Sequence, residues 1–280
     1  MLAAGALVLP WPWEARPPRA QVDRPARPAE APLGWRQIGR DARYVFGRPF
    51  HLDRSGWTRV GWVMGGGAAL YVARQDVREF AQDHRGGFDS VLDGARDVLG
   101  KGLTVPLVAL GYYLAGRARR SGYDTETAHI LLQSVTYSVV VATAGNVVLA
   151  AERPRDGDAL RFFASGGHGV SGDVSIASSL IAPIADRHLR LRSGDGRALR
   201  FWKRLGTWGL YGGAALVAYQ RLSEDAHWVP DVFLGYANGL TIGRLLVDSH
   251  RGGRAWRAAP RRAEVTWTPG GVRIVWGTPR

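Results

Sequence analysis

A histidine and an aspartate four residues apart are the residues best suited to chemistry in this chain. Of the seven histidines, only His227 has a carboxylate four residues on, at Asp231. Residues with this spacing are neighbours on one face of a helix, so the carboxylate can hold one ring nitrogen. The other nitrogen is then available as a nucleophile or a base. Arg221 ends the preceding apolar stretch, so a turn before His227 is expected to bring a guanidinium to the imidazole.

A second polar cluster lies between two apolar stretches further back in the chain. Arg153 and Arg155 follow the longest apolar stretch, and Ser171, Gly172 and Asp173 lead into the next one. The start of a helix presents backbone N–H groups that have no partner within the helix, and such groups bind anions. The two clusters together therefore predict an anion site made of guanidinium groups, backbone donors and an imidazole.

The order and spacing of these residues resemble the motifs of the superfamily of type 2 phosphatidic acid phosphatases and vanadium haloperoxidases. That superfamily has the motifs Lys-x6-Arg-Pro, Pro-Ser-Gly-His and Ser-Arg-x5-His-x3-Asp. The third motif is matched by 220–231, with Gln220 in place of the serine. The first resembles 153–156 and the second resembles 170–173, and the resemblance covers about residues 55–250.

The resemblance implies a metal-independent phosphatase without a cofactor. Its substrate would be a phosphate ester or a lipid phosphate, and the reaction would pass through a phosphohistidine. By the same resemblance, His227 is the nucleophile and Asp231 orients it. The phosphoryl group would be held by Arg153, Arg155, Ser171, Gly172 and Arg221.

Two positions depart from the family pattern. The motif lysine falls on Val148 when counted from Arg155, or on Asn146 when counted from Arg153. The histidine that protonates the leaving group is replaced by Asp173, which could act as an acid only if it is protonated. His168, five residues earlier, is the alternative proton donor. These departures leave open a non-catalytic relative that keeps the fold. A vanadate-dependent haloperoxidase is less favoured, because vanadate needs a richer cationic cradle.

The elements that must position these residues are expected to be helices. Six nearly uncharged stretches are longer than buried strands, and several run on into amphipathic sequence. They predict a mainly α, six-helix bundle over 55–250, and the resemblance implies that it is of the phosphatase and haloperoxidase type. A capping segment would precede it at 35–54, and a basic tail with a β-hairpin would follow at 251–280. The six stretches are 60–73, 102–116, 128–151, 174–185, 205–220 and 232–243.

Composition and the first residues bear on partners and location. The chain has 37 Lys and Arg against 24 Asp and Glu, a net charge of +13, which suits phosphate esters or anionic headgroups. Nothing beyond charge indicates nucleic acid, so no such partner is expected.

Residues 1–34 combine an apolar start that resembles an export signal with a Pro/Arg-rich linker. We therefore expect export to the cell envelope, either periplasmic or membrane-associated. The absence of cysteine excludes thiolate chemistry.

Overall fold

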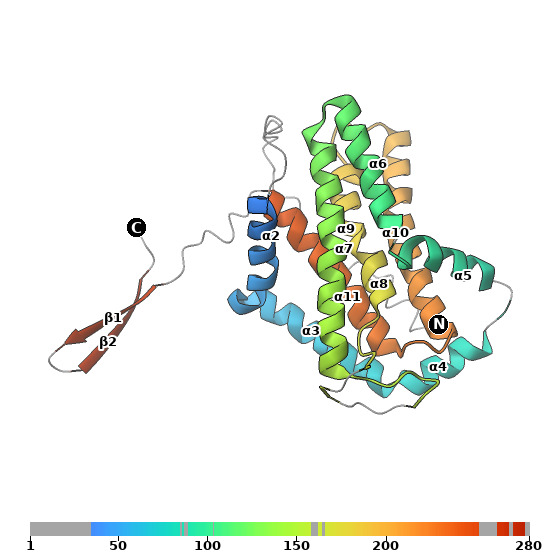
Figure 1. The fold of residues 1–280 in the computed structure, drawn as a ribbon, viewed down its shortest axis with the longest axis horizontal. Coiled ribbons are helices and arrows are strands. Elements are labelled where there is room, and N and C mark those ends of the chain that lie inside the picture. The colour runs from blue at the N-terminus through green and yellow to red at the C-terminus, as the bar shows by residue number, and fades with distance from the viewer. Residues whose placement is uncertain are drawn as a thin grey trace. The chain divides into compact units, whose positions relative to one another are not determined.

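The chain is mainly helical in the computed structural model (Figure 1). The model describes residues 35–84, 86, 89–102, 104–157, 162–163, 166–251, 262–268 and 271–277. The predicted export signal and linker at 1–34 lie outside the described residues. The chain divides into two units, Met1–Val247 and Asp248–Arg280. The functional residues predicted from the sequence all belong to the first unit.

Each of the six apolar stretches lies in helical structure, as predicted. They correspond to α3 (Arg54–Val72), α6 (Thr104–Arg119), α7 (Gly122–Leu149), α8 (Gly172–Ser179), α10 (Arg197–Ser223) and α11 (Val229–His250). The fourth stretch is not one continuous helix. After α8 the chain continues through the short α9 (Ile181–Ile184) and a π-helical turn, η3 (Ala185–Leu189).

Further helices precede or separate these six. The predicted capping segment contains α2 (Trp35–Gly47) and the 3₁₀ turn η1 (Arg48–His51). The charged sequence between the first two stretches forms α4 (Arg74–Asp83), α5 (Asp89–Ala95) and a second π-helical turn, η2 (Arg96–Gly100). The helices in the described part therefore exceed the six expected, because the amphipathic connections are themselves helical.

Helix α8 is at the centre of the first unit. Its residues Val174, Ser175, Ala177, Ser178 and Ser179 are all buried. It packs against α7, α10 and η2, while α6 runs alongside α7 (Figure 1). One apolar core joins α4, α8, α10 and α11, a second joins α6, α7 and α8, and a third joins α2, α7 and α11. The helix that begins at the predicted anion site is thus held from several sides.

A stripe of glycines lets α11 approach α8 closely. A Cβ atom added to Gly235 would lie 2.5 Å from the carbonyl oxygen of Ser171, and one added to Gly239 would lie 2.2 Å from that of Ser175. One added to Gly243 would lie 2.6 Å from the carbonyl oxygen of Ser179. The three glycines share one face of α11, and the absence of side chains there permits the close approach. The contact fixes the start of α8 against the start of α11.

The second unit contains two antiparallel strands. β1 (Arg262–Thr268) pairs with β2 (Gly271–Gly277), with Arg262 opposite Gly277 and Thr268 opposite Gly271. The predicted turn residues 269–270 lie outside the described residues.

Helices α3, α6, α7 and α10 each have several exposed large apolar side chains. They include Trp57 and Trp62 on α3, Leu107 and Leu114 on α6, and Trp202 and Trp208 on α10. Among the described helices, α7 alone is long and apolar enough to cross a membrane by itself, and 39% of its most apolar window is buried. The segment 89–100 and α6, bent by 55° relative to each other, would add a second if they are taken as one span.

Candidate active site

The turn between α10 and α11 positions the predicted nucleophile. The carbonyl oxygen of Arg221 accepts hydrogen bonds from the backbone N–H groups of Ala226 (3.1 Å) and His227 (3.3 Å). The indole N–H of Trp228 donates to the carbonyl oxygen of Glu152 at 2.9 Å, which ties this turn to the loop after α7. The imidazole is therefore placed by main-chain bonds at one end of α10 and by a side-chain anchor on the facing loop.

His227 and Asp231 form the expected pair. The Nδ1 atom of His227 lies 3.5 Å from Oδ2 of Asp231; the Asp231 side chain is buried and that of His227 is 11% exposed. This separation is at the outer limit of a hydrogen bond, and Nδ1 has no well-aligned partner within the described residues. Oδ2 of Asp231 also accepts the backbone N–H of Trp228 at 3.1 Å. Burial raises the pKa of the Asp231 carboxyl, and the neighbouring His227 opposes that shift.

Arg221 is held in place at the end of α10. It is buried, and one guanidinium nitrogen donates to the Glu224 carboxylate (2.8 Å) and to the side-chain oxygen of Gln220 (3.2 Å). Gln220 in turn donates to Asp93 on α5 at 2.9 Å. Burial lowers the pKa of Arg221, though arginine remains protonated at any ordinary pH. The Nε atom of Arg221 has no hydrogen-bond partner in the described part of the chain.

The two arginines after α7 occupy different environments. The Nε atom of Arg153 is buried and has no hydrogen-bond partner in the described part of the chain. The charge of Arg153 helps to lower the pKa values of both His168 and Arg221, which places its guanidinium near the two. The Arg155 side chain is half exposed and lies 3.9 Å from Asp156. The charge of Arg155 also lowers the pKa of His168, so both arginines act on the site, and Arg153 is the one whose Nε atom is buried.

His168 is brought to His227 by glycines. A Cβ atom at Gly167 would lie 2.0 Å from the Cα atom of Ala150, and one at Gly169 would lie 2.3 Å from the Leu149 side chain. Only glycine lets this segment pass so close to the end of α7. The rings of His168 and His227 are then 6.2 Å apart and nearly perpendicular. Burial, and next the charge of Arg153, lower the pKa of His168.

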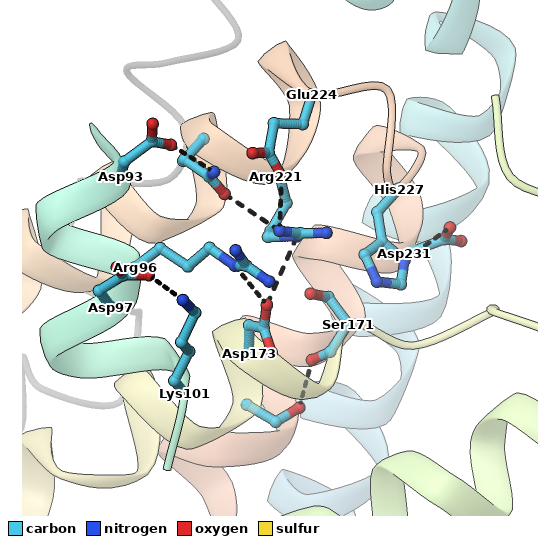
Figure 2. Close-up of polar contacts among 12 residues, drawn as sticks. Asp93, Arg96, Asp97, Lys101, Ser171, Asp173, Arg221, Glu224, His227 and Asp231 are labelled. Carbon is cyan, nitrogen blue, oxygen red and sulfur yellow. Dashed lines mark hydrogen bonds and ion pairs between the residues drawn. The ribbon is translucent and has the colours of Figure 1, made fainter. Parts of the chain in front are cut away.

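Ser171 and Asp173 face this group from the start of α8. Ser171 is fully buried, its backbone N–H donates to the carbonyl oxygen of Asp231 at 3.0 Å, and its hydroxyl has no partner in the described part of the chain. The Asp173 carboxylate accepts a hydrogen bond from Nε of Arg96 at 3.2 Å and lies 3.6 Å from Nε of Arg221. Figure 2 shows this carboxylate directed at both guanidinium groups.

Most of the site residues predicted from the sequence lie close together. Arg153, Ser171, Asp173, Arg221, His227 and Asp231 gather where the starts of α8 and α11 meet the end of α10 and the loop after α7. Gly172 is the first residue of α8, and Arg155 is directed toward Asp156.

Two residues of the cluster were not among the candidates chosen from the sequence. Arg96, on η2, reaches Asp173 from a segment 77 positions away in the chain. Glu224 neutralises part of the Arg221 charge. No spacing or motif marks Arg96 in the sequence, because its place depends on how η2 packs against α8.

Comparison with protein-family models, with curated proteins and with solved structures gives no match to this chain. The function proposed for this chain therefore rests on its residues and their geometry. Among the described residues, no group of three or more His, Asp or Glu side chains is arranged to hold a metal ion.

The cluster can act on an anion. Four buried polar atoms here have no hydrogen-bond partner in the described part of the chain: Nε of Arg153, Oγ of Ser171, Nε of Arg221 and Nδ1 of His227. Three of the four belong to groups that can donate to an oxyanion, and buried donors are normally satisfied. A tetrahedral anion placed beside the imidazole would accept hydrogen bonds from these three donors.

Proposed function

We propose that the chain is a metal-independent phosphomonoesterase or lipid-phosphate phosphatase that acts through a phosphohistidine at His227. The proposal includes the finer fold assignment, a divergent bundle of the type 2 phosphatidic acid phosphatase and haloperoxidase kind. One observation carries it: a largely buried His–Asp pair lies beside arginine and serine donors that have no hydrogen-bond partner in the described part of the chain.

In the first chemical step, the Nε2 atom of His227 attacks the phosphorus atom and the bond to the leaving oxygen breaks. Asp231, which lies toward Nδ1, balances the positive charge that develops on the ring. Arg153 and Arg221 stabilise the charge on the non-bridging oxygens, since a phosphoryl transition state needs mainly positioning and a cationic cradle. The Ser171 hydroxyl donates a further hydrogen bond.

The leaving oxygen needs a proton, and His168 is the better donor. Asp173 was predicted for this role, but its carboxylate is directed at the guanidinium groups of Arg96 and Arg221. His168 faces His227 across 6.2 Å, a distance between ring centroids that leaves room for the reacting oxygen. In the second step, His168 accepts a proton from the attacking water, and phosphate leaves His227.

A non-catalytic anion-binding protein is the second candidate. The pairing of Asp173 with Arg96 and Arg221 favours it, because part of the cationic charge is already neutralised. Both candidates predict phosphate binding, and only the first predicts turnover.

Phosphate release from p-nitrophenyl phosphate separates them. We expect the wild-type chain to release phosphate and His227→Ala to lose at least about a hundredfold of that rate. His84→Ala is the matched control, because His84 is exposed and its ring contacts Phe80, through a hydrogen bond to the carbonyl oxygen and by stacking on the phenyl ring. Equal rates for wild type and His227→Ala would refute the enzymatic proposal.

Membrane association is part of the proposal, and the exposed side chains support it. Helices α3, α6, α7 and α10 each leave several large apolar side chains uncovered, more than a soluble surface usually shows. Such a surface suits a protein of the cell envelope whose substrate is a lipid phosphate. Fractionation tests this: recovery with the membranes and a need for detergent are expected. A chain found in the cytosol and soluble without detergent would contradict it.

A further inference from the structure

The Asp173 carboxylate occupies the position where the cluster would hold an anion. It is a negatively charged group of the protein, located at the start of α8 and directed at Arg96 (3.2 Å) and Arg221 (3.6 Å). Arg221 is buried, and its Nε atom remains without a hydrogen bond even with the carboxylate nearby. The Ser171 hydroxyl, two residues before Asp173, is also buried and without a partner in the described part of the chain.

We propose that Asp173 is an internal anion that competes with the substrate phosphoryl group for Arg221 and Arg96, and that Arg96 is a third phosphate-binding guanidinium. The inference rests on the proposed function, because it takes the cluster to bind a phosphoryl group. On this account Arg96 replaces the cation that the family motif places on helix α7. Counted from Arg153, that cation falls on Asn146, whose side-chain oxygen accepts the backbone N–H of Val170 at 2.6 Å. Counted from Arg155, it falls on Val148, whose side chain is exposed on α7.

The Asp173 carboxylate can turn away and phosphate can take its place without unfolding of the protein. The Asp173 side chain is about one-third exposed, as is that of Arg96, so both can turn. A Cβ atom added to Gly100 would lie 3.2 Å from the Cβ atom of Asp173, so η2 passes close to the start of α8 and leaves the carboxylate as the part that can move. Phosphate would then meet three guanidinium groups, those of Arg96, Arg153 and Arg221.

The negative charge of Asp173 is expected to weaken phosphate binding. A carboxylate within about 4 Å of a bound phosphate opposes binding, and at a partly buried position this repulsion is worth at least about tenfold in affinity. Replacing the carboxylate by the uncharged amide of asparagine keeps the size of the side chain. It removes both the competition and the repulsion.

Titration calorimetry with inorganic phosphate and the purified full-length chain tests the proposal. We expect Asp173→Asn to bind phosphate at least about tenfold more tightly than wild type. We expect Arg96→Gln to bind it more weakly, both alone and in the Asp173→Asn background. Asp97→Asn and Lys101→Gln are matched controls, because these two residues pair with each other on the same segment at 2.6 Å and are about half exposed. Both controls are expected to stay within about twofold of wild type.

Equal or weaker phosphate binding by Asp173→Asn overturns the proposal, as does unchanged binding when Arg96→Gln is added to it. Circular dichroism establishes that each variant is folded, and Asp173→Ser decides the matter if the asparagine variant does not fold. Failure of the proposed function is distinguishable. If Asp173→Asn binds phosphate more tightly but neither it nor wild type turns over, the inference stands and the phosphatase assignment fails. If wild type turns over through His227 while Asp173→Asn gains no affinity, the inference fails alone.

Discussion

Replacing Gly239 with alanine tests the close packing that holds the site together. The added Cβ atom would lie 2.1 Å from the Ser178 hydroxyl and 2.2 Å from the backbone oxygen of Ser175, whereas ordinary contact begins at 3.4 Å. The second of these atoms is backbone, so α8 and α11 must separate by roughly 1 Å. Because α8 carries Ser171 and α11 carries Asp231, this separation disturbs the site as well as the core.

The expected magnitude follows from two opposing effects. Overpacking by one methyl group costs about 1–3 kcal/mol, and the better helix propensity of alanine returns up to about 1 kcal/mol. The free energy of unfolding should therefore fall by about 1–2 kcal/mol, which lowers the Tm by roughly 2–8 °C. Thermal unfolding followed by far-UV circular dichroism measures this change.

Gly212→Ala is the matched control, because a Cβ atom at Gly212 on α10 meets nothing within 4 Å. The same substitution there should raise the free energy of unfolding by up to about 1 kcal/mol. The opposite signs are the essential result. If Gly239→Ala were as stable as wild type, or if both variants shifted the Tm equally, the packing of α8 against α11 described above would be wrong.

Three further predictions concern single side chains. Arg153→Gln should lower the rate of phosphate release by about 10²–10³-fold, the usual effect of losing one transition-state donor. Arg155→Gln should change it less than about threefold, because Arg155 is half exposed beside Asp156; equal losses would contradict the assignment of Arg153. Burial and the Arg153 charge lower the pKa of His168 below the ordinary histidine value of about 6.5, so a rate that needs protonated His168 should already fall as the pH rises toward that value. That pH dependence should be absent from a rate profile of His168→Asn, and a profile like that of wild type would contradict its role as the acid. Burial also lowers the pKa of His188, so its contribution to stability is complete above about 6.5, the ordinary pKa of histidine, and is lost as the pH falls through the lower folded-state value. The Tm of His188→Phe should therefore fall less than that of wild type between pH 7 and pH 5, and equal decreases would refute this.

Much of the local structure was predictable from the sequence because the signals are short in range. The apolar stretches predicted helices, and each is helical. The four-residue spacing of His227 and Asp231 predicted a pair, and the two atoms lie 3.5 Å apart. The glycines at every fourth position of α11 are also visible in the sequence, and such a stripe lies on one helix face and allows close packing.

The parts that sequence did not reveal depend on tertiary contacts. Arg153 and Arg155 are two residues apart in one loop, and no local pattern indicates which of the two has a buried Nε atom. Arg96 joins the cluster through the packing of η2 on α8, which no local pattern encodes. Asp173 was interpreted as a protonated acid from its place in a motif, since the two arginines that approach it come from distant segments.

The most direct test of the central claim is to trap the phosphorylated protein. The full-length chain is mixed briefly with a ³²P-labelled phosphate ester and quenched in base, because a phosphohistidine is stable in base and labile in acid. The account predicts labelled wild-type protein whose label is lost in acid, and no label on His227→Ala. His84→Ala should be labelled like wild type. A label that persists in His227→Ala, or wild-type turnover without any acid-labile label, would contradict the account.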